Sequence, residues 1–171
     1  TVVSREEVFV LTRRPGPAPL PRGLRPVGDE DVAALAQLHR QVLPPLMFQA
    51  QGEPLYRSGP REMPRRGRGV EYVWSDKGRA SAHLQLWRGV RGHWMELTVL
   101  PECRADVLPC IRYALAELGE AGEMSVYAPV PDYAVGLAWL LRTLGFDSFC
   151  RQTLMVAHTV SRVSVRRPIL V

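Results

Sequence analysis

The chain has 171 residues, of which 46% are hydrophobic and 23% charged, proportions typical of a globular protein of one domain. Because no apolar run approaches the ~20 residues that span a bilayer, and no basic-then-apolar leader is seen at Thr1, we expect a cytoplasmic protein with no membrane association. The formal net charge of +5 comes largely from Arg57–Gly69, in which five arginines face one glutamate.

The first elements are two short strands, Val8–Leu11 and Leu24–Val27, joined by an extended proline-rich linker at Pro15–Arg22. A helix follows, capped by Gly28 or Asp29. Its apolar residues recur at helical spacing and predict one buried face. They are Val32, Leu35, Leu38 and Val42.

Three strands come next and form an antiparallel meander, because short connectors containing glycine indicate hairpins. They are Val70–Ser75, Ala80–Trp87 and His93–Leu100. Trp87 and Trp94 flank the second connector, which predicts a cross-strand pair.

The pattern then changes to alternating helices and strands. The predicted elements are a helix at Asp106–Leu118, a strand at Met124–Pro129, a helix at Leu137–Leu144 closed by Gly145, and two short strands at Phe146–Phe149 and Thr153–Thr159. This order predicts an α/β (α+β) fold, a mixed and mostly antiparallel sheet of about six to seven strands with helices on both faces. We divide the chain into an N-terminal strand and linker (1–23), a main domain (24–160) and a tail (161–171).

The three cysteines, Cys103, Cys110 and Cys150, include no C-x-x-C pair. A disulfide framework or a zinc site is therefore not expected. We expect reduced and mostly buried thiols, and no metal. His83 and His93 on adjacent strands are a weaker candidate for a metal site or a base, against a role as polar filling.

The element order and three segments resemble the GNAT acyltransferase superfamily. The segments are LRPVGDEDVAALAQLH at Leu24–His39, WMELTVLPE at Trp94–Glu102 and GLAWLLRTLGF at Gly136–Phe146. The resemblance implies an acyl-CoA acyltransferase fold in which two strands splay apart around coenzyme A. Those strands would be His93–Leu100 and Met124–Pro129.

The resemblance also implies acetyl-CoA as the cofactor. Its pantetheine arm would pair with the strand edge at Leu97, Thr98, Val99 and Leu100. The family's phosphate-binding loop corresponds to PECRADVLPC, in which Arg104 matches the first position, while Val107 and Pro109 replace the two small residues. Since Pro109 has no N–H and Asp106 adds a carboxylate, we expect a weakened phosphate cradle.

Two residues are predicted to be catalytic. Glu96, on the central strand, could take a proton from an amine, against the alternative of a solvated carboxylate paired with an arginine. Tyr133 could protonate the departing thiolate, because the position at which many relatives place tyrosine is Leu141 here. Trp94 is a predicted substrate contact, and so are Arg65 and Arg66 of the arginine-rich loop.

Three hypotheses follow. The first is an acyl-CoA-dependent N-acyltransferase, with acetyl the expected group and a small-molecule or protein amine as acceptor. The second is a catalytically inactive domain of this fold that binds a ligand or partner. The third, nucleic-acid binding by the arginine-rich loop, is least favoured because interleaved aromatics are missing, and a solvated loop is the commoner explanation of the charge. A homodimer, with the N-terminal strand as a swapped edge, is one further option.

Overall fold

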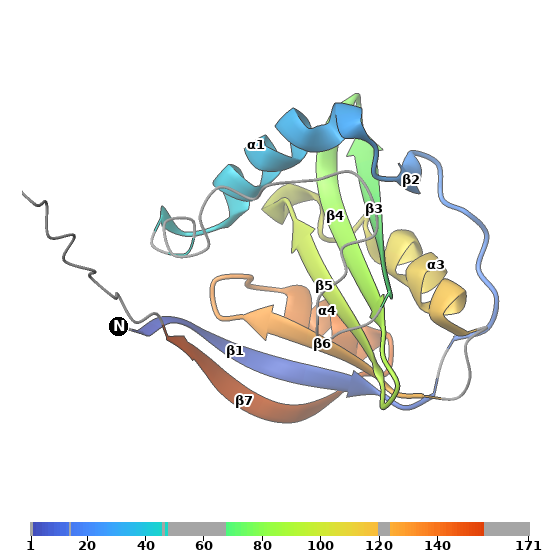
Figure 1. The fold of residues 1–171 in the computed structure, drawn as a ribbon, viewed down its shortest axis with the longest axis vertical. Helices are drawn as coiled ribbons and strands as arrows, with labels where there is room; N and C mark the ends of the chain where they lie inside the picture. The colour runs from blue at the N-terminus through green and yellow to red at the C-terminus, as the bar shows by residue number, and fades with distance from the viewer. Residues whose placement is uncertain (1, 14, 46, 48–67, 120–123, 156–171) are drawn as a thin grey trace, which may run out of the picture.

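A single seven-stranded sheet organises the protein, with strand order β2-β3-β4-β5-β6-β1-β7 (Figure 1). The structure, a computed structural model, describes residues 2–13, 15–45, 47, 68–119 and 124–155. The strands are β1 (Val2–Leu11), β2 (Leu24–Pro26), β3 (Arg68–Asp76), β4 (Arg79–Arg88), β5 (His93–Val99), β6 (Val126–Pro131) and β7 (Asp147–Met155). The helices are the 3-10 turns η1 (Asp29–Asp31) and η2 (Pro101–Cys103), and α1 (Val32–Val42), α3 (Leu108–Gly119) and α4 (Leu137–Thr143).

The predicted meander is confirmed as β3, β4 and β5, which pair antiparallel with one another. Within the described residues, β5 and β6 pair in parallel and the five other neighbouring strand pairs are antiparallel. Trp87 lies directly opposite Trp94, as the connector predicts. The fold class is therefore the expected mixed, mostly antiparallel sheet.

The N-terminal strand is longer than predicted and lies inside the sheet. β1 pairs with β6 along one edge and with β7 along the other. Phe9, near the C-terminal end of this strand, is fully buried, and the Arg142 guanidinium of α4 lies 5.4 Å from the centre of its ring. Both edges of β1 are thus paired within the chain, and a homodimer with this strand swapped stays a prediction.

The prediction of two strands after Gly145 is wrong, because β7 is one strand from Asp147 to Met155. Its pairing with β1 skips Phe149, which forms a bulge: Val8 lies opposite Cys150 and Phe9 opposite Ser148. The polar residues after Phe149 belong to an exposed edge strand, where polar side chains carry little cost. Residues 156–159 of the second predicted strand lie outside the described residues.

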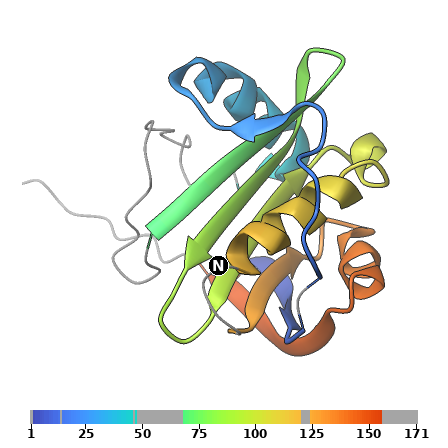
Figure 2. The same ribbon diagram turned by 90° about the vertical axis from the view of Figure 1, so that its right-hand side faces the viewer.

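Helices cover both faces of the central strands, as expected. His39 of α1 contacts His83 on β4, whereas Tyr113 of α3 contacts Tyr72 on β3. Because Tyr72 lies opposite Leu84, the neighbour of His83 in sequence, these contacts mark opposite faces of the sheet. Figure 2 shows α3 in front of the strands.

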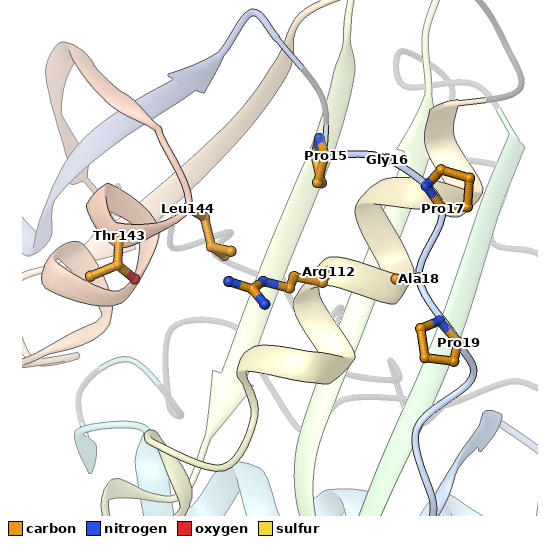
Figure 3. Close-up of a pocket in the computed structure, with 8 residues that line it drawn as sticks. All are labelled: Pro15, Gly16, Pro17, Ala18, Pro19, Arg112, Thr143 and Leu144. Carbon is orange, nitrogen blue, oxygen red and sulfur yellow. The ribbon is translucent and has the colours of Figure 1, made fainter.

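The proline-rich linker runs along the α3 side of the molecule (Figure 3). With Arg112 of α3 and the end of α4 at Thr143 and Leu144, it lines a pocket of about 400 Å³. The linker thus carries the chain from β1 to β2, at the far end of the sheet, without crossing the α1 face.

We predict that Phe9→Ala destabilises the fold by about 3–5 kcal/mol, because it empties a fully buried aromatic site in an interior strand. Urea denaturation followed by circular dichroism measures the loss. Phe149→Ala on the neighbouring strand is the control, since that side chain is 60% exposed and its removal should cost about 1 kcal/mol or less. Equal losses for the two variants would contradict the interior position of β1.

Candidate functional site

The two strands that the sequence predicts to splay apart do so. β5 and β6 pair at His93–Val126 and Trp94–Tyr127, and no later residues of either strand form a bridge with the other among the described residues. β5 nevertheless continues to Val99. Figure 1 shows the strands close at one end and diverging toward the other.

Gly92 allows the close approach at the joined end. A Cβ at this position would lie 2.8 Å from the ring of Tyr127 and 3.2 Å from the Ser125 carbonyl oxygen. One residue later, the His93 N–H donates to that same carbonyl at 2.8 Å. The beginning of β5 is therefore held against β6, and the separation develops only beyond it.

The backbone of β5 presents alternate N–H groups to the two sides of the strand. The Leu100 N–H donates to the Ser81 carbonyl at 3.0 Å, toward β4. Because the direction of the N–H groups alternates along a strand, the Thr98 N–H also points toward β4. The N–H groups of Leu97 and Val99 point to the opposite side, where β6 diverges from β5. Of the four backbone positions predicted to meet a cofactor, two thus face the divergence.

The loop after β5 uses its backbone donors internally. The N–H groups of Asp106 and Val107 both donate to the Cys103 carbonyl at 3.1 Å. The Val107 side chain is fully buried in the core, while Asp106 and Pro109 are exposed. This loop therefore leads directly into α3 and does not spread its N–H groups around an anion.

Arg104, the one position that matches the family's phosphate loop, reaches across to the turn before α4. Its Nη1 donates to the Val135 carbonyl, and its pKa is lowered from the usual arginine value by burial. The residues present consequently fit only part of coenzyme A. The β5 edge can pair with an amide arm, whereas the loop does not offer the backbone cradle that a pyrophosphate needs.

Glu96 lies on β5 beside the divergence, half-buried, on the face of the sheet that α1 covers. The indole Nε1–H of Trp94 donates to its Oε1 at 2.8 Å. This bond joins two of the predicted site residues and fixes the direction of the carboxylate.

Tyr133, in the turn after β6, is half-buried. Its pKa is raised first by burial and then by the carboxylates of Glu6, Asp132 and Glu96. The phenol is therefore protonated at neutral pH, and the two predicted catalytic residues lie within electrostatic reach of each other. Sequence spacing alone left this proximity open.

A line of polar side chains crosses the α1 face of the sheet. Glu71 lies opposite Gln85, and Gln85 opposite Glu96. In the next row, His83 Nε2 lies 2.9 Å from Glu71 Oε2, and its Nδ1 lies 3.2 Å from Nε2 of His39 on α1. The sequence analysis missed Glu71 and His39. The alternation of polar residues on β4 was the available signal, but it also fits a solvated face.

His83 and His93 do not form the shared site that we considered. His83 lies opposite Thr98 and His93 opposite Arg88, so the two are five positions apart along the hairpin, roughly 17 Å at the usual strand rise. Both are buried, not exposed. Odd spacing along paired strands also places them on opposite faces.

The remaining predictions concern the arginine-rich loop, metal binding, membrane spans and the cysteines. Arg65 and Arg66, the predicted substrate contacts, lie outside the described residues. In the described part of the chain, no cluster of three metal-ligating side chains occurs, and no helix has both the length and the apolarity to cross a membrane. Cys103 and Cys110 are buried free thiols, whereas Cys150 is exposed.

An ion pair fixes the start of α1 against the sheet. Both terminal nitrogens of Arg25, on β2, lie 2.6 Å from the carboxylate oxygens of Asp31, which also accepts from the Gly28 N–H at 2.9 Å. The bond from Arg25 lowers the pKa of Asp31 despite its burial. Because His39 follows on the same helix, this pair helps to position it.

Comparison with known proteins identifies the fold. No protein-family model matches the sequence, and no curated protein does. Solved structures do match. A GNAT-family protein from Novosphingobium aromaticivorans aligns over 90% of this chain and 64% of its own, with 18% identity and a TM-score of 0.58. A GCN5-related N-acetyltransferase from Sphaerobacter thermophilus aligns over 90% and 51%, with 16% identity and a TM-score of 0.56.

N-myristoyltransferase from Saccharomyces cerevisiae, solved with myristoyl-CoA, aligns over 88% of this chain and 49% of its own, with 11% identity and a TM-score of 0.55. The chain thus has the GNAT acyl-CoA acyltransferase fold. It spans about half to two thirds of the length of these proteins.

We predict that Asp31→Asn lowers the free energy of unfolding by about 2 kcal/mol at pH 7, because it removes a charged hydrogen-bond acceptor. The native pKa of Asp31 is depressed, so its contribution is complete well above about pH 4 and is lost as pH falls through the native pKa. Urea denaturation at pH 7, 5 and 3 should show the difference from wild type persisting at pH 5 and shrinking at pH 3. Asp29→Asn, at an exposed neighbour, should cost less than about 0.5 kcal/mol; a difference for Asp31→Asn that does not vary with pH would contradict the assignment.

Proposed function

We propose that the chain carries an acyl-CoA-dependent N-acyltransferase site, with acetyl-CoA as donor and an amine as acceptor. The observation that carries this proposal is the divergence of β5 from β6, which leaves the Leu97 and Val99 N–H groups on an open strand edge beside Glu96. The fold of the solved acyltransferases supports it. A cytoplasmic location and a homodimer stay predictions.

In this proposal, bound acetyl-CoA supplies the acyl group as a thioester. The N–H groups of Leu97 and Val99 would hold its amide arm and polarise its acyl carbonyl, and Arg104 would bind its phosphates. Glu96 accepts a proton from the attacking amine, with its carboxylate fixed by the Trp94 indole. Tyr133 donates a proton to the departing sulfur, because its raised pKa keeps the phenol protonated until then.

A second candidate function is a domain of this fold that binds a ligand without catalysis. The loop before α3 favours it, because two of its N–H groups are already bonded to the Cys103 carbonyl and Pro109 has none. Phosphate binding would then rest on side chains such as Arg104. A cofactor held this way would bind more weakly than one in a full backbone cradle.

Calorimetric titration with acetyl-CoA decides between the candidates. Binding together with acylation of primary amines supports the enzyme; the release of the free thiol of coenzyme A measures this acylation. Binding without turnover favours the second candidate. No binding at high micromolar acetyl-CoA would eliminate the acyltransferase proposal.

We predict that Glu96→Gln lowers kcat by about 10²–10⁴-fold while leaving acetyl-CoA affinity nearly unchanged, since the amide keeps its acceptor for the Trp94 indole but is not a base. Steady-state kinetics and calorimetry on the same samples measure the two quantities. Glu30→Gln, whose side chain is 71% exposed near the start of α1, is the matched control and should keep wild-type kcat. An active Glu96→Gln protein would refute the assigned role.

A further inference from the structure

A pocket beside the turn between β4 and β5 is rich in aromatic side chains, and the proposed reaction does not yet use it. It has a volume of about 490 Å³ and lies at the end where β5 and β6 are joined (Figure 1). This volume falls in the range of small-molecule sites. The lining residues are Trp87, Gly89, Val90, Arg91, Gly92, His93, Trp94 and Tyr127.

Three of the lining residues form one row across the sheet. Trp94 on β5 lies opposite Trp87 on β4 and opposite Tyr127 on β6. Side chains that lie opposite each other on neighbouring strands point to the same face, so the three rings share the face that carries Glu96. Trp87 is 1% exposed, whereas Trp94 and Tyr127 are half-buried. A ligand in the pocket can therefore contact the last two rings.

The Tyr127 ring is held in place by its neighbours. Phe149 on β7 meets it edge to face, with the ring centroids 5.3 Å apart and the ring planes at 69°. Gly92 lies against it as well, because an added Cβ would come within 2.8 Å of the ring. The ring thus keeps its orientation before a ligand arrives, which lowers the entropy cost of binding.

Trp94 connects the pocket to the proposed base. It lines the pocket, and its Nε1–H donates to Glu96 Oε1 at 2.8 Å. Glu96 lies two residues further along β5 on the same face, roughly 7 Å at the usual strand rise. Leu97 and Val99, whose N–H groups would hold the thioester, follow directly. The order along β5 is therefore aromatic pocket, base and thioester.

The charge at the pocket favours an aromatic monoamine over a diamine. Of the eight described residues that line it, only Arg91 has a permanently charged side chain. Arg91 is exposed and lies in the turn, five residues before Glu96. A second ammonium group in the pocket would lose hydration beside this guanidinium and would find no carboxylate among the eight lining residues. An aromatic ring needs no such partner and gains from contact with the rings of Trp94 and Tyr127.

We propose that this pocket binds the acceptor, and that the acceptor is a primary amine joined to an aromatic ring by a short carbon chain. A chain of about two carbons spans the distance from the row of rings to Glu96. The free amine nitrogen bonds to the acetyl carbon as the C–S bond breaks. Glu96 takes one N–H proton, and Tyr133 gives one to the sulfur. This assignment of the acceptor rests on the proposed function.

Aromatic rings in a row also stabilise a hairpin, so the test must measure the choice of ligand. Phenethylamine, cyclohexylethylamine and diaminobutane serve as probes; the second matches the first in size but has no π-system. NMR of the indole N–H groups follows binding without acetyl-CoA. We expect phenethylamine to shift the Trp94 signal and to leave that of Trp139, which is 70% exposed on α4, unchanged. Diaminobutane should shift neither.

Acetylation of the same amines is then measured. In the wild-type protein, kcat/KM should be about fivefold higher for phenethylamine than for cyclohexylethylamine, the usual gain from aromatic contact, and at least about tenfold higher than for diaminobutane. Tyr127→Leu should raise KM for phenethylamine about fivefold, more than it changes kcat, and remove the preference over cyclohexylethylamine. Tyr127→Phe keeps the ring and should keep the preference. Trp139→Leu is the matched control and should behave as wild type.

Equal kcat/KM for phenethylamine and cyclohexylethylamine in the wild-type protein overturns this assignment, and so does a preference for diaminobutane. An equal loss with both ring-bearing amines in Tyr127→Leu also overturns it, because that result is the signature of a purely structural role. These outcomes leave the proposed function standing, since amines are still acetylated. Failure of the wild-type protein to bind acetyl-CoA instead overturns the proposed function. The NMR titration then decides by itself whether the pocket binds an aromatic amine, and an unshifted Trp94 signal means that it does not.

Discussion

The partial pairing of β5 with β6 is the constraint on which the rest of the structure depends. At its beginning, β5 is fixed to β6 because Gly92 admits the Tyr127 ring and His93 bonds to Ser125. Along its far edge, β6 pairs with β1 over six residue pairs and follows that strand. β5 follows β4 over seven pairs. Two halves of one sheet thus hold the strands apart, so the open edge is a property of the whole fold and not of a local loop.

The two faces of the central strands are both buried, but one is lined by apolar side chains and the other carries polar ones. On β4, Ala82, Leu84 and Leu86 join the core, whereas His83 and Gln85 lie on the other face beneath α1. Alternation on a strand usually separates core from solvent. Here α1 covers the polar side and is itself fixed to β2 by Arg25 and Asp31. The polar side chains consequently meet one another in place of bulk water, which strengthens their mutual electrostatics.

The features that could be predicted from the sequence are those determined by residues close together in the chain. Strong periodicity and short glycine turns predict the meander, α1 and α4 correctly, because local pattern and tertiary burial agree there. The interior position of β1 is decided by partners more than a hundred residues away, among them Glu6 with Gln152, and no local pattern contains that. His39 was missed for the same reason: its polar partner lies 44 positions later in the chain. Glu96 was predicted because a carboxylate on a central strand stands out locally.

The loop before α3 shows how a chain can keep the fold while its phosphate-binding loop changes. Backbone N–H groups at a helix start serve either an anion or the helix itself, and they cannot serve both fully. In this chain Asp106 and Val107 give theirs to Cys103, and Val107 adds a fully buried side chain to the core. Pro109, in the first turn of α3, suits helix initiation because its missing N–H had no intrahelical partner there. Val107 and Pro109 thus stabilise the start of α3, whereas the strand edge beside Glu96 is set by the pairing of β5 with β4 and of β6 with β1.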